Sequence, residues 1–514
     1  MPTVIHTFTN LWLVWHHIAI EVDANKALPT IDIIWLPWAA IKESKERIRA
    51  TFRNSWIQLP ARKIILNLAP SHIKKEWTRF DVPLAVAILR LIKEPQWVLE
   101  NFLDSVLFFG ELWLDWSIKS VNGVLPSVIS AYKAGRKKFV VPMANAAELK
   151  YIPNICVYPV STFSQILDFF NQPSLLQKLC LEQESLNNIE YKDPLIDFAD
   201  IKWHTVAKRA LTIAAAGMHN VLMSWPPWSW KSMLAKSLQW ILPPLTFNEI
   251  VEVSQIYSLI WVLNESQPLI TTRPRRSVHH TASKVSIVWW GRDLRPWEIS
   301  LSHHWILFFD ELPEFPREVL EVLRQPLEDK IITISRANWS VEYPSDFMFV
   351  AAMNPCKCWF YQDRHKACVC SIQEVKRYQA KISWPLLDRF DLVLEIHRED
   401  IDKIMDNIVE ESSQISKDAV VDARNRQQKR YIDDVYTNNS QLWSKWIHKY
   451  ITLDEDSEQF LKTLVKKMHM SARVVHRSIK LARTIADIQW VDKIQKRHVA
   501  EAFQYREKWL FVDT

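Results

Sequence analysis

The chain has 514 residues, of which 48% are hydrophobic and 24% charged, as in ordinary soluble globular proteins of about three domains. No run approaches ~18 uncharged apolar residues, and the first ten residues lack the features of a secretory signal. These features argue against a membrane span and favour a cytoplasmic location. A formal net charge of +6 is compatible with a polyanionic partner but is too small to identify one.

Residues 1–172 alternate short β-rich runs with helical stretches. Strands are expected at 18–22, 31–34, 63–66 and 139–142, and helices at 39–54 and 128–134. This pattern predicts an α/β or α+β domain. Residues 173–196 are polar and interrupted by prolines, which is typical of a linker.

Residues 197–398 repeat a strand, a loop and a helix, and the strands are almost continuously apolar. Such strands favour a parallel sheet covered on both faces, so this part is predicted to be an α/β domain. The remaining residues, 399–514, are predicted to contain no strands. Within them, 399–440 are highly charged and are expected to be flexible, whereas 454–508 have the spacing of amphipathic helices.

A candidate phosphate-binding loop follows an apolar run at 221–224. It reads Trp225-Pro226-Pro227-Trp228-Ser229-Trp230-Lys231-Ser232, and with glycine at its three tryptophans it matches G-x-x-x-x-G-K-[ST] completely. The backbone amides must curl around the phosphates, which requires positive φ angles and no side chain in the way. Lys231 would reach the β- and γ-phosphates, and Ser232 would hold Mg²⁺. With three indole rings the loop should not bind ATP, and a plain surface loop is the alternative.

The tryptophan content is abnormal. The chain has 5 Gly and 26 Trp, whereas ~7% glycine would give about 36. The two counts together match an ordinary glycine content. The tryptophans follow Asn in a turn (Asn338-Trp339), flank prolines (Trp225-Pro226-Pro227-Trp228) and are doubled in an expected loop (Trp289-Trp290-Gly291). We hypothesise that most are UGA codons, which some bacterial lineages decode as glycine. The alternative is a genuinely tryptophan-rich, degenerate ATPase.

Polar residues end two further apolar strands. Asp310 and Glu311 follow the strand at 306–309, where Asp310 would bind Mg²⁺ and Glu311 would polarise the attacking water. Asn354 follows the strand at 347–352 and could position the same water, although an asparagine before Pro355 also suits a simple turn. Between these strands, residues 330–343 predict a hairpin whose turn would be Asn338-Gly if Trp339 is a glycine.

Four cysteines and a basic segment lie in this domain. Cys356, Cys358, Cys368 and Cys370 could form a tetrahedral Zn²⁺ site, but their C-x-C spacing is tighter than usual, so reduced structural thiols are the alternative. Cys156 and Cys180 are expected to be ordinary buried residues. Residues 273–295 carry six Lys/Arg against one acid and could contact nucleic-acid phosphates, with His279-His280 in the same surface. The alternative is a solvated loop.

Together these motifs resemble the magnesium-chelatase-like AAA+ ATPases, most closely the ComM/YifB family of bacterial proteins. The resemblance covers nearly the whole chain, and its most specific stretches include SVHHTAS, WILFFDELPEF, VAAMNPCKC and WPLLDRFDL. It implies a P-loop AAA+ core at 197–398 and a C-terminal α-helical lid at 399–514. It also implies an N-terminal Lon-protease-like domain of the S5 domain 2 type at 1–172.

The resemblance also implies roles for individual residues. Asn354 would sense the γ-phosphate, Arg389 would be the arginine finger offered to the next subunit, and Arg473 would be the second sensor from the lid. Each arginine has a surface salt bridge as its alternative. The N-terminal domain is expected to lack the Ser-Lys dyad of proteolytic relatives. The segment where they carry the nucleophile, Lys75–Asp81, contains no serine, and Pro126 stands near the position of their lysine. Peptidase activity is therefore not expected.

The leading interpretation is an ATP- and Mg²⁺-dependent motor, a homo-hexameric ring that remodels or translocates DNA, as in branch migration or helicase activity during recombination of incoming DNA. One alternative is a chelatase-type motor that drives metal insertion into a porphyrin. The other is a scaffold with an inactive nucleotide site, as the printed tryptophans would require.

Overall fold

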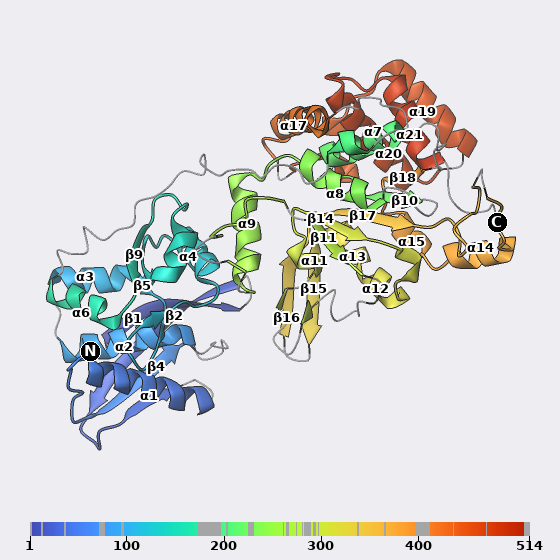
Figure 1. Cartoon of the computed structure of the whole chain (residues 1–514). Coiled ribbons are helices and arrows are strands. Elements are labelled where there is room, and N and C mark those ends of the chain that lie inside the picture. Colours follow the sequence, from blue (N-terminus) through green and yellow to red (C-terminus); the bar gives the residue numbers. More distant parts are fainter. Residues whose placement is uncertain are drawn as a thin grey trace. The chain divides into compact units, whose positions relative to one another are not determined.

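The computed structural model describes residues 3–11, 14–34, 38–70, 78–93, 97–172, 197–201, 204–224, 231–260, 262–263, 267–273, 275–279, 281, 289–290, 295–296, 298–336, 339–363, 366–396, 412–434, 436–468 and 470–507. Contacts divide the chain into two compact units (Figure 1). The first contains Met1–Glu190 and Phe247–Thr271, and the second contains Tyr191–Thr246 and Thr272–Thr514. The predicted domain borders at 172, 196 and 398 remain predictions.

The first unit is an α+β fold. Its strands are β1 (Thr3–Leu11), β2 (Val14–Asn25), β3 (Ile31–Ile34), β4 (Lys63–Ala69), β5 (Val106–Phe108), β6 (Glu111–Leu112), β7 (Ile118–Lys119), β8 (Lys138–Pro142) and β9 (Cys156–Val160). Its helices are α1 (Trp38–Asn54), α2 (Asp81–Ile92), α3 (Trp97–Ser105), α4 (Val124–Lys133), α5 (Met143–Ala146), α6 (Phe163–Asn171) and α9 (Phe247–Ser258).

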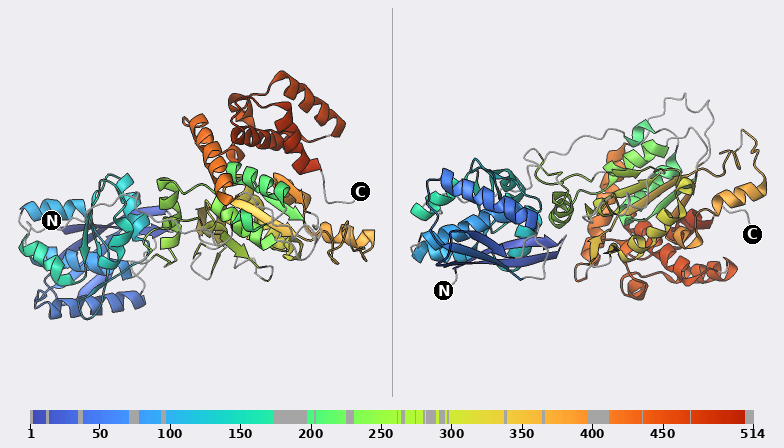
Figure 2. Two further views of the ribbon diagram at one scale, coloured as in Figure 1. Left: turned by 45° about the horizontal axis from the view of Figure 1, so that its top comes forward. Right: turned by 90° about the horizontal axis from the view of Figure 1, so that it is seen from below.

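Two sheets organise this unit. The order β1-β2-β4-β3 is antiparallel except for the β3–β4 pair, and β5-β8-β9 is parallel. The strand β4 alternates buried and half-buried residues, and α2, whose first nine residues are all buried, packs on β1 and β2 (Figure 2). The strands and helices predicted in this region are confirmed, with ends that differ by a few residues.

The prediction that Cys156 and Cys180 are ordinary buried residues is wrong for Cys156. Cys156 in β9 is only half-buried and is disulfide-bonded, whereas Cys180 lies outside the described residues.

The second unit contains a five-stranded parallel sheet. Its strands are β10 (Val221–Ser224), β11 (Arg275–Val278), β14 (Ile306–Phe309), β17 (Met348–Met353) and β18 (Leu392–Glu395), and the order is β11-β14-β17-β10-β18. Every residue of β10, β14 and β17 is buried. The prediction of a parallel sheet covered on both faces is therefore confirmed.

Helices and two short hairpins complete the second unit. The hairpins are β12 (Trp289–Trp290) with β13 (Arg295–Pro296) and β15 (Ile331–Arg336) with β16 (Trp339–Pro344). The helices between residues 205 and 387 of this unit are α7 (Thr205–Gly217), α8 (Lys231–Ile241), α11 (Glu298–Leu301), α12 (Arg317–Val322), α13 (Arg324–Asp329), α14 (Ile372–Gln379) and α15 (Trp384–Leu387). The C-terminal helices are α17 (Ser413–Arg430), α18 (Ile447–Tyr450), α19 (Glu455–Met468), α20 (Ala472–Ile488) and α21 (Lys496–Glu507).

The C-terminal helices share one hydrophobic cluster with the sheet. The predicted flexibility of 399–440 is wrong for 413–430, because α17 is an 18-residue helix there. Val420 and Ala423 of α17 are buried against α7 and α8, so tertiary packing orders a sequence that is too polar to look structured by itself. The described part of 399–514 contains no strand, as predicted.

Candidate nucleotide site

Three strands deliver the predicted nucleotide-site residues to one edge of the sheet. In register, Ser224 of β10 pairs with Met353 of β17, and Phe309 of β14 pairs with Ala351. The phosphate loop, Asn354 and Asp310 are the next residues after these strands, and parallel strands end at a common edge. The fold therefore brings the three motifs together at adjacent strands, with β17 between the other two.

The phosphate loop itself, 225–230, lies outside the described residues. The helix α8 begins at Lys231 and runs for 11 residues, so it starts directly after the loop. The N-terminus of such a helix presents free amides and the positive end of its dipole to an anion. The strand and helix that the motif requires are thus both present, and the roles of Lys231 and Ser232 stay predictions.

The acidic pair after β14 is held in a turn with an unusual backbone. Glu311 has a φ of +52°, a left-handed conformation that is uncommon outside glycine, and its amide donates a 2.9 Å hydrogen bond to Oδ1 of Asp310. Both residues are half-buried. Strained backbone of this kind concentrates at functional sites, where the surrounding structure enforces it.

Asn354 is buried at the tip of β17, with 7% of its surface exposed. The helix α14 supports the turn that follows, since Nε2 of Gln379 donates a 3.1 Å hydrogen bond to the carbonyl oxygen of Pro355. Asn354 is therefore held at the same edge of the sheet as the acidic pair.

The opposite, amino-terminal edge of the sheet carries a buried polar cluster that the sequence motifs did not indicate. Asn220 precedes β10, donates from Nδ2 to the carbonyl oxygen of Arg389 at 2.9 Å, and accepts from the amide of Phe349 at 2.9 Å. One side chain thus connects β10 to β17 and to the segment before β18. The signal available in the sequence was a polar residue directly before a buried strand.

Asp391 occupies the centre of this cluster. Its Oδ2 accepts from the amide of Asn220 at 3.1 Å and lies 3.4 Å from Nδ1 of His219, while Arg477 approaches Oδ1 at 3.6 Å. Burial raises the pKa of Asp391, but the nearby Arg477, His219 and Arg506 more than offset this effect and hold the pKa well below its usual range. The carboxylate stays charged and anchors α20 to the sheet.

Both predicted arginines lie at this amino-terminal edge. Arg389 is buried, with its guanidinium bound to the carboxylate of Glu328 and to the carbonyl oxygens of Arg324 and Pro385. Arg473, in the first turn of α20, lies 3.1 Å from the other carboxylate oxygen of Glu328 and its side chain is 52% exposed. Because β10 has four residues, about 13 Å of strand separates this edge from the chain's own phosphate loop.

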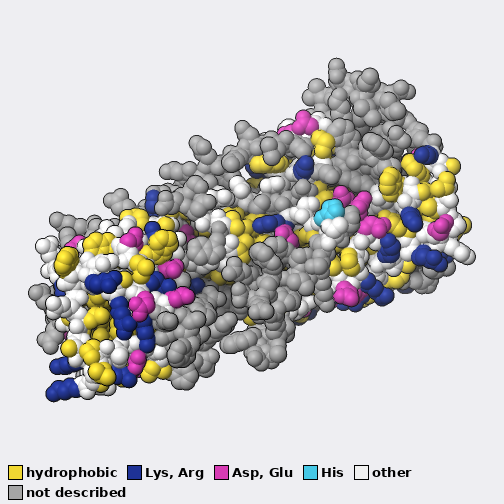
Figure 3. Space-filling model, turned by 60° about the horizontal axis from the view of Figure 1, so that its bottom comes forward, with side chains coloured by type: hydrophobic (Ala, Val, Ile, Leu, Met, Phe, Trp, Pro, Cys, Tyr) yellow, Lys and Arg dark blue, Asp and Glu magenta, His cyan; other side chains and the backbone are white. Residues whose placement is uncertain are grey.

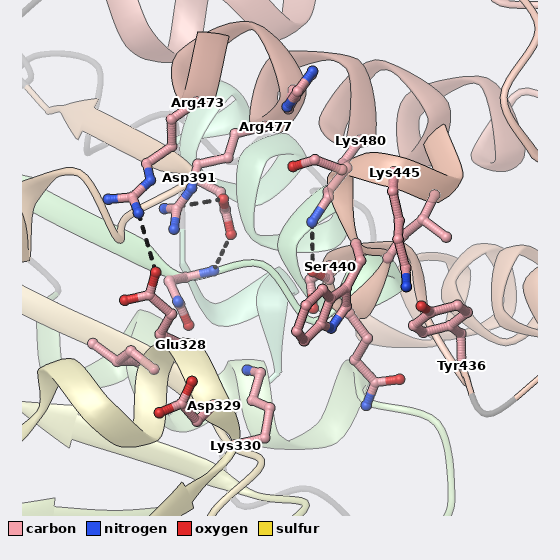
Figure 4. A pocket seen from close by; sticks show the side chains of 17 residues that line it. Glu328, Asp329, Lys330, Asp391, Tyr436, Ser440, Lys445, Arg473, Arg477 and Lys480 are labelled. Atoms are coloured by element: carbon pink, nitrogen blue, oxygen red, sulfur yellow. Dashed lines mark hydrogen bonds and ion pairs between the residues drawn. The ribbon is translucent and has the colours of Figure 1, made fainter. Parts of the chain in front are cut away.

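A cavity of about 600 Å³ opens beside these arginines. Its walls include Arg473, Arg477 and Lys480 from α20 and Glu328 from α13 (Figure 4). Burial lowers the pKa of Lys480 to about 8, and its Nζ donates to the carbonyl oxygen of Ser440 at 3.1 Å. The cavity is a cation-rich hollow at the amino-terminal edge of the sheet.

Several described tryptophans have a backbone that suits glycine. Ten described residues other than glycine have positive φ, and four of them are Trp56, Trp116, Trp359 and Trp490. Left-handed backbone costs an L-residue roughly 1–2 kcal/mol, and only glycine, with occasional Asn or Asp, adopts it routinely. All four are also exposed to solvent, unlike typical tryptophans.

The four clustered cysteines come together in the loop between β17 and α14. Their sulfur atoms all lie within 4.8 Å of one another, and none of the four is in a disulfide.

Two further predictions require correction. Trp339 pairs with Arg336 as the first residue of β16, so it lies in a strand rather than in the predicted turn, and residues 337–338 lie outside the described residues. Arg273, counted in the basic segment, is buried and donates to the carbonyl oxygens of Pro243 and His304. Its role is structural. His280 and most of the basic segment lie outside the described residues.

The structure describes residues 78–81 of the segment where proteolytic Lon-type domains carry their nucleophile. Asp81 begins α2, and its carboxylate accepts from Oγ of Ser44 at 2.8 Å and from Nε of Arg47 at 2.7 Å. Burial raises the pKa of Asp81 to about 6 despite these partners. Pro126 lies inside α4. Residues 75–77 lie outside the described residues, so the absence of a dyad stays a prediction.

The surface in Figure 3 mixes Lys and Arg with Asp, Glu and hydrophobic side chains over the coloured residues. Within the described part of the chain, each helix is too short or too polar to cross a lipid bilayer.

Comparisons with known proteins agree with this fold. Residues 197–404 match the family "Magnesium chelatase, subunit ChlI", residues 20–145 match "Subunit ChlI of Mg-chelatase", and residues 410–506 match "Magnesium chelatase, subunit ChlI C-terminal". The chain is 36% identical to the YifB protein of Salmonella typhimurium over 98% of this chain and 96% of the relative. It is 36% identical to "Competence protein ComM" of Haemophilus influenzae, over 95% of this chain and 94% of the relative.

The YifB protein of Escherichia coli is 35% identical over 98% of this chain and 97% of the relative. These matches run through both compact units rather than through the ATPase sheet alone. The chain belongs to the ComM/YifB family of magnesium-chelatase-like AAA+ ATPases.

Proposed function

We propose that this protein is an ATP-hydrolysing ring motor that remodels or translocates DNA, as in branch migration or helicase activity during recombination of incoming DNA. The observation that carries the proposal is the parallel sheet, whose order places the ends of β10, β14 and β17 at one edge. A strand-loop-helix phosphate site, an acidic pair and a buried asparagine are the parts that ATP hydrolysis requires there.

We infer that Trp225, Trp228 and Trp230 are glycine in the native protein, through UGA codons. The left-handed backbone of Trp56, Trp116, Trp359 and Trp490 supports this inference, because four unrelated turns would each prefer glycine. With glycine at 225, 228 and 230, the loop amides are free to surround a triphosphate. With indole rings there, the loop has no room for one.

The residues at the carboxyl edge then have distinct roles. Lys231 binds the β- and γ-phosphates, while Ser232 and Asp310 hold Mg²⁺. Bound there, the metal would supply positive charge that offsets the negative charge of the phosphates. Glu311 accepts a proton from the attacking water, and Asn354 orients that water toward the γ-phosphate. Asp310 and Asn354 follow adjacent strands, which suits these roles.

The amino-terminal edge serves the next subunit. Arg389 and Arg473 lie a full strand length from their own phosphate loop, so they suit a triphosphate bound by a neighbouring copy. A head-to-tail contact of this kind closes into a ring, and a hexamer is the assembly we propose. In that contact the neighbour's phosphates replace Glu328 as the anion that binds both arginines.

DNA is the proposed substrate because of charge and relatives. The relative from Haemophilus influenzae is named a competence protein. Residues 275–295 contain five Lys/Arg, and the hairpin of β15 and β16 projects from the same unit. A porphyrin-metallating motor is not favoured, because relatives named ComM and YifB match nearly the full chain. An inactive scaffold would require the tryptophans to be authentic.

Two measurements test the proposal. Gene codons and peptide masses from native protein should show glycine at 225, 228 and 230. The glycine-bearing chain should then hydrolyse ATP and displace strands from forked or four-way DNA, and the Lys231→Ala variant should do neither. UGG codons together with no nucleotide binding would overturn the ATPase, whereas ATP hydrolysis that DNA neither stimulates nor requires would overturn the DNA substrate.

A further inference from the structure

We propose that Cys356, Cys358, Cys368 and Cys370 bind one Zn²⁺ ion, and that this ion positions Asn354 against α14. The metal site rests only on the geometry of the loop. The positioning role rests on the proposed function of Asn354.

The sulfur atoms have the spacing of a tetrahedral site. The Cys356–Cys358, Cys358–Cys368 and Cys356–Cys368 sulfur pairs are 3.3, 3.4 and 3.7 Å apart, and all four sulfurs lie within 4.8 Å of one another. A tetrahedron with Zn–S bonds of about 2.3 Å has sulfur–sulfur edges of about 3.8 Å. A disulfide would bring two sulfurs to about 2.05 Å. The cluster is therefore much closer to metal coordination than to paired disulfides.

The backbone between the ligands is folded to bring them together. After the first pair, the amide of Trp359 donates to the carbonyl oxygen of Cys356 at 3.1 Å, and Trp359 has a φ of +76°. A glycine at 359 would form this tight turn without strain. Further along, Oδ1 of Asp363 accepts from the amide of Lys366 at 2.9 Å, which turns the chain back toward the second pair.

Each cysteine pair is attached to a different element of the ATPase unit. Cys356 is buried and comes two residues after Asn354, at the end of β17. Cys370 directly precedes Ser371, the N-cap of α14, whose side chain exchanges hydrogen bonds with Glu374 in a capping box. One ion bound by both pairs would tie the end of β17 to the start of α14.

That connection has a mechanical consequence for the nucleotide site. The other end of α14 already contacts the same turn, through Gln379 and the carbonyl oxygen of Pro355. With the ion in place, the turn that carries Asn354 is held from both ends of α14. Without it, this turn loses the attachment to the start of α14, and the position of Asn354 relative to the γ-phosphate is less well fixed.

Four thiolates select a soft metal over Mg²⁺ or Ca²⁺, which prefer oxygen ligands. A closed set of four protein ligands is typical of structural zinc, because a catalytic site leaves one position open for water. A mononuclear iron site would use the same ligands. The elemental analysis below separates the two metals.

The first experiment measures metal content in the untagged full-length chain, purified under reducing conditions. We expect elemental mass spectrometry to find about one zinc per chain. After zinc is replaced by Co²⁺, the visible absorption spectrum should show the bands of tetrahedral thiolate coordination. The Cys370→Ser variant should lose at least about tenfold in zinc affinity, and Cys370→His should retain zinc because histidine is also a ligand. Cys156→Ser, outside the cluster, should leave the zinc content unchanged.

The second experiment separates metal binding from its positioning role. After zinc is stripped and the chelator removed, the ATPase rate measured with saturating Mg²⁺ should be lower, and added Zn²⁺ but not additional Mg²⁺ should restore it. The Asn354→Ala variant should be inactive yet retain zinc. A chain with no zinc and no cobalt bands, or with stoichiometric iron instead, overturns the zinc site. A zinc-bound chain whose ATPase rate, measured with Mg²⁺, survives complete removal of the zinc overturns the positioning role. Absent ATPase activity in a zinc-bound chain would instead contradict the proposed function.

Discussion

The guanidinium of Arg389 forms an ion pair with Glu328, within the same subunit and at the edge of the sheet opposite to Lys231. Glu328 also binds Arg473, so one carboxylate from α13 holds two cations that come from far apart in the sequence. Both arginines are thus already gathered at one surface before any neighbouring subunit is present. This arrangement leads to a test of whether they act on a neighbour's nucleotide.

Mixing two inactive variants should restore ATP hydrolysis. Lys231→Ala removes the proposed phosphate ligand, and Arg389→Ala removes the proposed arginine finger, whose loss should cost about 10³–10⁵ in rate. In mixed rings, the Arg389→Ala subunit keeps an intact Lys231, and its Lys231→Ala neighbour can supply the missing Arg389. This arrangement occurs at roughly a quarter of the contacts if subunits mix randomly in equal amounts. A phosphate-release assay on the mixture measures the recovery.

A second mixture is the control. Lys231→Ala and Glu311→Gln both damage the subunit's own site, so no contact between them contains an intact set, and the mixture should stay inactive. If Arg389→Ala mixtures also stay inactive while the rings still exchange subunits, Arg389 does not act between subunits.

Replacing Glu311 by glutamine should separate nucleotide binding from hydrolysis. The amide cannot accept the proton of the attacking water, so the ATPase rate should fall by about 10²–10⁴ while ATP affinity is retained. Steady-state hydrolysis and equilibrium binding of a fluorescent ATP analogue measure the two effects. Glu314→Gln is the matched control, since Glu314 lies three residues away in an exposed pair with Lys381. An equal loss in both variants would point to a damaged turn rather than to proton transfer.

The tryptophan hypothesis makes a stability prediction for a matched pair of positions. Trp490 and Trp443 are each 65% exposed, and both contact a cation, but φ is +59° at Trp490 and −73° at Trp443. Trp490→Gly should raise the free energy of unfolding by about 1 kcal/mol, because it removes left-handed strain. Trp443→Gly should lower it by about 0.5–1 kcal/mol, because glycine adds freedom to the unfolded chain. Urea unfolding of both variants measures the difference, and the same sign of change in both would contradict the strain argument.

Glu148 in the first unit should make stability depend on pH. Burial raises its pKa to about 7, although Asn145 and Ser258 donate hydrogen bonds to it. The folded state therefore keeps the proton while the unfolded state has lost it, so this group contributes stability at low pH that is lost as pH rises from about 4.5 through 7.

The Glu148→Gln variant should remove that dependence. We expect it to raise the free energy of unfolding by about 2–3 kcal/mol at pH 8, with little change at pH 5. Denaturant unfolding at both pH values measures this, with the exposed Glu46→Gln as control. A variant that is equally destabilised at both values would show that the hydrogen bonds of Glu148 outweigh its burial.

Much of the nucleotide site was predictable because it depends on local order along the chain. A buried parallel strand has an apolar run, and the polar residue after it must emerge at the carboxyl edge, which is why Asp310, Glu311 and Asn354 could be found from the sequence. The spacing of hydrophobic residues did not indicate the helix α17. Its polar sequence forms a helix only because Val420 and Ala423 contact α7 and α8.

The amino acid sequence by itself determined the family, the strand ends that carry the candidate catalytic residues, and the spacing of the cysteine pairs. It did so because these features depend on neighbours within a few residues. Only the tertiary structure decided that Asn220 connects β10 to β17 and to the segment before β18, that Glu328 binds both Arg389 and Arg473, and that four thiols meet beside Asn354. Those contacts join residues from 12 to more than 140 positions apart, and the order in which strands pack, which no local pattern specifies, brings them together.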